Sequence, residues 1–285
     1  MSGLGAFAMM TLRSHTRRIL GLVAFGLLFI AAGAVARVMT GGGEHGQVEM
    51  DMIFEMGGAT LVSALLLLGW LVGRFPMIAA LVLMQGVFSA DRAAGYTRLY
   101  GVRPRSLVLL YATRFKTLAI VAFVLSALVL PLFDMLILGE WPDIGVFVLI
   151  MAQILVFGSV TAALSLLTRA DAWLALFLAM VALVWDGLRR MDFFQAAAPL
   201  VREGVSVLLP PQGALMRIEA AFGAMQPVPW DAFLYIAMYA TLLMLLTGVA
   251  LTRRELSRLR YLSRAAAMSA PATSTSEFSR AADAA

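Results

Sequence analysis

The sequence predicts an all-α integral membrane protein with six transmembrane helices, an N-terminal interfacial helix and both termini in the cytoplasm. Of the 285 residues, 61% are hydrophobic and only 14% are charged, too apolar a balance for the water-facing surface of a soluble domain. The apolar residues form blocks of the roughly 20 residues that a helix needs to cross a bilayer core. The alternating pattern of a membrane β-barrel is absent, and the basic residues cluster in a few loops, as in membrane proteins that follow the positive-inside rule.

The first predicted span is residues 19–38. The preceding stretch, Leu4–Arg13, is apolar but short and is followed by the basic run 15–18. This order predicts an interfacial helix with cytoplasmic anchors. A cleaved signal peptide is the alternative, because residues 34–36 read Ala-Val-Ala, but the apolar run is longer than a signal core of roughly 7–15 residues.

The second apolar block, residues 57–90, follows an acidic loop that is expected to lie outside, and Gly73-Arg74-Phe75-Pro76 interrupts it. A straight helix of this length would reach about 51 Å, so the block is either one kinked span or two spans. One span gives six in total and keeps the arginines near the C-terminus inside, which the positive-inside bias favours. Arg74 then lies within the span and should face protein or a wet cavity, because an arginine at mid-bilayer costs about 2.5–3.5 kcal/mol.

Four further spans are predicted from apolar runs between charged loops: 108–132, 144–167, 172–188 and 232–251. The loop 189–231 contains apolar pieces that are too short to cross, and these predict short helices on or in the outer leaflet. With this topology about 15 basic residues lie inside and about 5 outside. The membrane domain is expected to cover residues 1–264, and the Ala/Ser/Thr-rich residues 265–285 to form a disordered cytoplasmic tail.

The segment 91–106 is short, polar and basic, and it lies between two long apolar runs. It resembles the cytoplasmic coupling segment of ABC-2 type transporter permeases, which work with a separate ATPase. The matching positions are Asp91, Arg92, Gly95, Leu99, Pro104 and Ser106, with Arg114 where many members have a basic residue. The span count, the interfacial helix and Leu208-Leu209-Pro210 in the outer loop are also similar to that family. One departure is Leu107, since an arginine often follows the serine in the family.

The resemblance implies a multi-pass permease subunit of an ABC exporter in the bacterial inner (plasma) membrane, moving an unknown substrate. It implies a dimer with a second copy or a related permease, together with ATP-binding cassette ATPase subunits that hold the ATP and Mg. The residues expected to contact the ATPase are Asp91, Arg92, Gly95, Tyr96, Arg98, Leu99, Arg103 and Pro104. This chain itself is not expected to be an enzyme, because its only lysine, Lys116, has no glycine-rich turn before it and therefore forms no P-loop.

Two other classes of function stay open, an ion-coupled carrier or channel and a non-transporting membrane scaffold or assembly protein. Carriers commonly place ionisable residues at mid-span and contain internal repeats; here Arg74 is the exception among nearly uncharged spans. No catalytic, cofactor or metal site and no nucleic-acid partner is expected. The chain has no cysteine and two histidines, and the group Glu44, His45, Glu49 and Asp51 is better explained as solvated charges on a glycine-rich loop than as a cation site.

Overall fold

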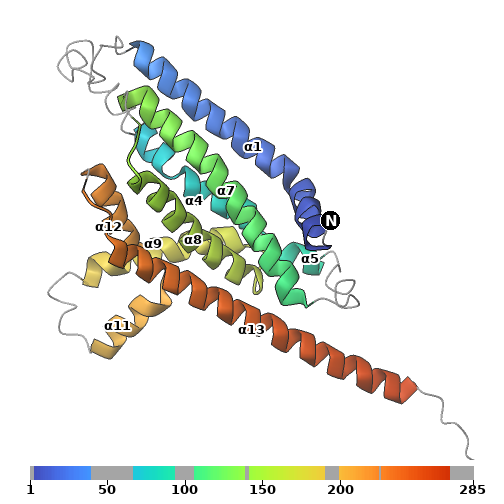
Figure 1. The fold of residues 1–285 in the computed structure, drawn as a ribbon. Coiled ribbons are helices and arrows are strands. Elements are labelled where there is room, and N and C mark those ends of the chain that lie inside the picture. Colours follow the sequence, from blue (N-terminus) through green and yellow to red (C-terminus); the bar gives the residue numbers. More distant parts are fainter. Residues whose placement is uncertain are drawn as a thin grey trace, which may run out of the picture.

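The computed structural model describes residues 3–39, 67–93, 106–138, 141–189, 199–224 and 226–269, and within these ranges every regular element is a helix (Figure 1). The labelled helices are α1 (Gly3–Met39), α4 (Phe75–Met84), α5 (Ser89–Ala93), α7 (Leu107–Leu138), α8 (Gly145–Ser165), α9 (Asp171–Arg189), α11 (Pro199–Leu208), α12 (Gln212–Gly223) and α13 (Trp230–Ser269). Five described helices are long and apolar enough to cross a membrane, and the bent pair Leu67–Gly73 and Phe75–Ala93 could make a sixth span. The prediction of an all-α membrane protein is confirmed at this level.

The long helices alternate in direction, with α1, α7 and α9 running one way and α4, α8 and α13 the other (Figure 1). Helix α8 lies at the centre and packs against α4, α7, α9, α12 and α13. Its apolar stretch is 78% buried, against 17% to 39% for the other four long helices. A helix that is apolar all round fits such a central position.

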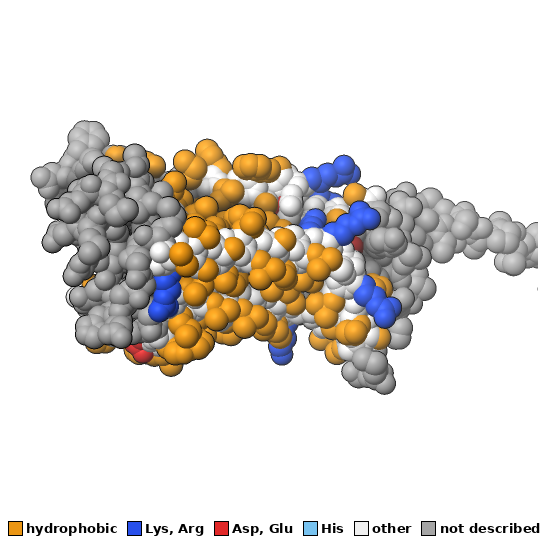
Figure 2. All heavy atoms as spheres, turned by 90° about the horizontal axis from the view of Figure 1, so that it is seen from above, with side chains coloured by type: hydrophobic (Ala, Val, Ile, Leu, Met, Phe, Trp, Pro, Cys, Tyr) orange, Lys and Arg blue, Asp and Glu red, His pale blue; other side chains and the backbone are white. Residues whose placement is uncertain are grey.

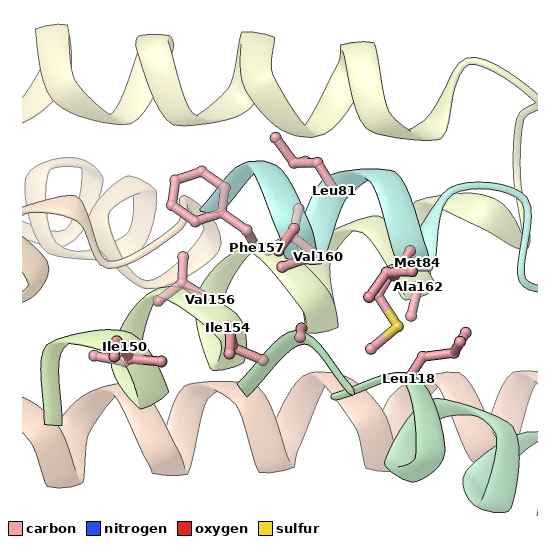
Figure 3. Close-up of a cluster of buried hydrophobic side chains, with 14 of the residues drawn as sticks. Leu81, Met84, Leu118, Ile150, Ile154, Val156, Phe157, Val160 and Ala162 are labelled. Atoms are coloured by element: carbon pink, nitrogen blue, oxygen red, sulfur yellow. The ribbon is translucent and has the colours of Figure 1, made fainter. Parts of the chain in front are cut away.

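The core forms where α8 meets α4 and α7 (Figure 3). Leu81 and Met84 of α4, Leu118 of α7, and Ile154 and Phe157 of α8 are all at most 6% exposed. By contrast, many large apolar side chains are exposed, chiefly on α1, α7, α9 and α13. Figure 2 shows them as a broad belt on one face of the molecule. Several Lys and Arg side chains lie toward the end of the molecule where α1 begins and α5 lies (Figure 1 and Figure 2). An apolar belt of this extent suits contact with lipid rather than water.

Helix α1 differs from the expectation of a separate interfacial helix before residues 19–38. It runs without a break from Gly3 to Met39. The connecting residues contain neither Gly nor Pro, and the hydroxyls of Ser14 and Thr16 bond to carbonyls one turn earlier in the same helix, so nothing there interrupts the helix. One buried face continues along the whole length of α1 through Phe7, Thr11, His15, Leu22, Gly26, Phe29 and Gly33.

Gly26 allows a close approach of α1 to α7. A Cβ atom added at Gly26 would lie 2.6 Å from Val129 Cγ2, whereas one added at Gly21 would meet nothing within 4 Å. We expect Gly26→Val to destabilise the protein by about 1–3 kcal/mol through overpacking, and Gly21→Val to leave stability nearly unchanged. Unfolding in detergent micelles with increasing SDS, followed by circular dichroism, compares the two. Equal losses would show that the α1–α7 contact is not tight at Gly26.

The interrupted second block contains one sharp bend. The helical segment Leu67–Gly73 and the helix from Phe75 onward meet at 44°, and Arg74 lies between them. Pro76 in the first turn of α4 lacks the N–H that would continue the helix. The kink expected at 73–76 is therefore present. The short helices predicted in the loop 189–231 are also present, as α11 and α12, and α12 packs against α8, α9 and α13.

The C-terminal helix runs slightly further than the sequence predicts. Helix α13 continues to Ser269, beyond the residue 264 where the predicted membrane domain ends. Residues 270–285, which make up the rest of the predicted tail, lie outside the described part of the chain.

Candidate functional site

A four-residue turn, residues 85–88, separates α4 from α5 immediately before the predicted coupling segment. Helix α4 ends at Met84, Gly86 has a φ of 75°, and α5 begins at Ser89. Glycine is the residue that adopts such a positive φ without strain. Val87 and Phe88 in this turn are 0% and 4% exposed, so the backbone polar groups around them need partners within the protein.

The start of α9 and the end of α8 each provide a side chain that accepts hydrogen bonds from this turn. The carboxylate of Asp171, at the start of α9, accepts a hydrogen bond from the Gly86 N–H at 2.7 Å. The Ser165 hydroxyl, at the end of α8, accepts from the N–H groups of Phe88 at 2.9 Å and Ser89 at 3.0 Å. Both acceptors are fully buried, which makes these bonds costly to break.

Two arginines supply donors to the same region. Arg18 of α1 donates to the carbonyls of Val82 at 3.1 Å and Gln85 at 2.6 Å, which are among the last carbonyls of α4 and lack helical partners. Arg92 of α5 donates to the carbonyl of Leu166 at 2.8 Å, where α8 has just ended. The turn is thus tied to both α1 and α8.

A buried ion pair completes the arrangement. Asp91 of α5 and Arg114 of α7 lie 2.6 Å apart, and each side chain is 10% exposed. The Tyr111 hydroxyl donates to the same Asp91 oxygen at 3.3 Å, and its ring packs on Phe88 with centroids 4.5 Å apart. We name the α4–α5 turn with its side-chain partners the α4–α5 clamp; these partners are Arg18, Asp91, Arg92, Tyr111, Arg114, Ser165 and Asp171.

The described residues include only part of the predicted ATPase-contact set. Asp91 is 7% exposed and paired within the protein, whereas Arg92 is exposed. Ser106 precedes α7, and its hydroxyl accepts the N–H of Leu109 at 3.3 Å, which is the bonding pattern of a helix N-cap. The remaining predicted contacts lie outside the described residues: Gly95, Tyr96, Arg98, Leu99, Arg103 and Pro104.

A second polar site lies at the bend before α4. The guanidinium of Arg74 forms an ion pair with Glu219 of α12, and the two side chains are 24% and 22% exposed. Arg74 also lies over the ring of Trp70, 5.6 Å from its centroid, within the range of a cation–π contact. Of the two expected surroundings of Arg74, protein or a wet cavity, the structure shows protein. The sequence analysis did not single out Glu219.

Gln153 of α8 connects this ion pair to the backbone on both sides of the helix break. Its Nε2 donates to the carbonyl of Gly73 at 3.0 Å and to Glu219 at 3.3 Å, and its Oε1 accepts the N–H of Met77 at 3.2 Å. The side chain therefore satisfies a carbonyl and an N–H on the two sides of the helix break. Such repair is needed wherever a helix is broken away from water.

Within the described ranges, no three His, Cys, Asp or Glu side chains are grouped so as to hold a metal ion. The loop with Glu44, His45, Glu49 and Asp51 lies outside those ranges. No protein-family model, curated protein or solved structure matches this chain.

Proposed function

We propose that this chain is the permease subunit of an ABC exporter of the ABC-2 type. In this proposal six helices span the bacterial inner membrane, both termini and the segment 91–106 face the cytoplasm, and a separate ATPase subunit supplies the energy. A second copy or a related permease completes the transporter. The observation that best supports the proposal is the α4–α5 clamp, because it lies directly at the start of the segment that would meet the ATPase.

The clamp gives that segment a mechanical connection to the transmembrane helices. Helix α5 is tied to α7 by the ion pair of Asp91 and to the end of α8 by the hydrogen bond of Arg92. The turn before α5 is tied to α1 and α9 by hydrogen bonds to Arg18 and Asp171. Polar contacts of this kind are strong and directional where water is excluded. A force on the segment that follows α5 would therefore move several helices together, as a transporter driven from one membrane face requires.

In this proposal the predicted contact residues have different roles. Asp91 is buried against Arg114, so it positions α5 and is not offered to a partner. Arg92 donates to Leu166 within the clamp but is exposed, so in this proposal it can also contribute to the partner surface with the residues that follow it. Leu99 and Tyr96 would act as apolar anchors and Arg98 and Arg103 would face acidic groups of the ATPase, as in other docking interfaces.

A double substitution in the segment tests this assignment. We expect Arg98→Asp with Leu99→Asp to abolish co-purification of a P-loop ATPase with the tagged chain from native membranes in mild detergent, while membrane insertion stays normal. Arg169→Asp changes another exposed arginine, outside the segment, and should keep the ATPase bound. The proposal fails if the wild-type chain purifies without an ATPase, or if the double variant retains it.

The site around Arg74 favours one alternative, an ion-coupled carrier. Carriers often hold ionisable residues at broken helices within the membrane, and Arg74, Glu219 and Gln153 meet at such a break. Uptake or export in proteoliposomes separates the two proposals. Transport driven by a proton or sodium gradient without any ATPase would support the carrier, whereas dependence on the ATPase and ATP would support the permease.

A further inference from the structure

A groove with a volume of about 690 Å³ lies between α7, α8 and α13. Its walls include Phe115 of α7, Leu155 of α8, and Met244 and Leu245 of α13, and Arg253 lies among its lining residues. The volume is typical of sites that hold one small molecule. The groove plays no part in the α4–α5 clamp or in the site around Arg74.

Small side chains create this space. Helix α13 approaches α7 at Gly248, where an added Cβ would lie 3.6 Å from Val108 Cγ1. Around that contact, Ala112 of α7, Ser159 of α8 and Ala240 of α13 line the groove and leave room between the helices. The groove therefore results from the packing of three described helices.

The hydroxyl groups in the groove are already bonded to their own helices. Ser159 donates to the carbonyl of Leu155 at 2.6 Å, and Thr252 donates to that of Gly248 at 3.0 Å. Thr241 likewise donates to a carbonyl one turn earlier, at 2.7 Å. These groups need no partner from an occupant, so the body of the groove suits an apolar chain.

One end of the groove carries the positive charge of Arg253. Arg253 is exposed and makes no hydrogen bond or ion pair with another described residue. It is the last residue of the apolar stretch Trp230–Arg253 of α13, and the chain continues with Arg254, Arg258, Arg260 and Arg264. A cluster of arginines directly after a membrane helix is typical of sites that attract anionic lipids.

An apolar groove ending in a free guanidinium matches a molecule with a hydrocarbon tail and an anionic head. We propose that the groove binds one anionic phospholipid, with an acyl chain between α7 and α13 and the headgroup phosphate on Arg253. The lipid comes from the leaflet on the side of Arg253. This site is independent of the proposed transport function, because its lining depends only on the packing of the helices.

Native mass spectrometry of the purified full chain tests the proposal. The chain is titrated in detergent with phosphatidylglycerol or with phosphatidylcholine of the same acyl chains. We expect one phosphatidylglycerol to be retained in preference to phosphatidylcholine. Arg253→Gln should weaken phosphatidylglycerol binding about tenfold, the size expected for a charge-assisted hydrogen bond, and remove the preference. Ala112→Phe, which fills the groove from an exposed position, should reduce the binding of both lipids.

Two control variants match these changes away from the groove. Arg169→Gln removes another exposed arginine, and Ala31→Phe enlarges an exposed alanine on α1; both should bind phosphatidylglycerol as the wild type does. The proposal is overturned by equal binding of the two lipids, by equal losses in variants and controls, or by inorganic phosphate displacing the lipid. It is also overturned if Ala112→Phe converts a dimer to a monomer, since a second copy would then occupy the groove.

Discussion

Replacing Asp91 by alanine is expected to lower the free energy of unfolding by about 3–5 kcal/mol. The change leaves the guanidinium of Arg114 buried without its counter-charge, a situation that is costly in this range. Both side chains are only 10% exposed, so water cannot replace the carboxylate. The loss also removes the acceptor of the Tyr111 hydroxyl. Unfolding with SDS in detergent micelles, followed by circular dichroism, measures the effect.

The double variant Asp91→Ala with Arg114→Met serves as the control. Removing both partners of a buried ion pair is often nearly neutral, whereas removing one is not. The double variant should therefore recover most of the stability that Asp91→Ala loses. If it is no more stable than the single variant, the ion pair is not what holds α5 to α7.

The parts of the fold that the sequence predicts depend on composition and on local chemistry. Long apolar runs require helices because backbone groups in lipid must be paired within the segment. The bend at Arg74 was predictable from the interruption Gly73-Arg74-Phe75-Pro76, in which Pro76 removes one helical N–H. The short helices α11 and α12 follow from apolar pieces that cannot cross a bilayer. None of these predictions needs knowledge of which helices touch.

The polar sites depend on contacts between distant residues, and these are not visible in one sequence. The sequence predicts Asp91 as a contact with the ATPase and shows Arg114 only as a basic residue near the start of a span, yet the two side chains form an ion pair with each other. Arg74 was expected to face protein, but its partner Glu219 lies 145 residues away. The available signal was that the two residues carry charges of opposite sign in largely apolar stretches, but Glu219 has Arg217 two residues before it and so does not stand out. The continuity of α1 was missed because polar residues 14–18 suggested a boundary, although they can bond within a helix.

Replacing Glu219 by alanine is expected to destabilise the protein by about 2–4 kcal/mol. This is less than the roughly 3–5 kcal/mol for breaking a fully buried pair, because about a fifth of each side chain stays exposed. The substitution leaves Arg74 without its counter-charge and removes one acceptor of Gln153. The comparison variant is Arg217→Ala on the same helix. Its ion pair with Asp231 is exposed, with side chains 58% and 67% accessible, so its loss should lower stability far less than Glu219→Ala does.

The isosteric variant Glu219→Gln separates charge from hydrogen bonding at this site. An amide oxygen can still accept from Arg74 and Gln153, but it no longer neutralises the guanidinium. A stability between those of the wild type and Glu219→Ala would show that both contributions matter, as expected for a partly buried ion pair at a helix break. If Glu219→Ala is instead no more harmful than Arg217→Ala, the contact between α12 and the bend is not part of the stable core, and α12 is held by Leu215 and Ile218, which are 1% and 2% exposed.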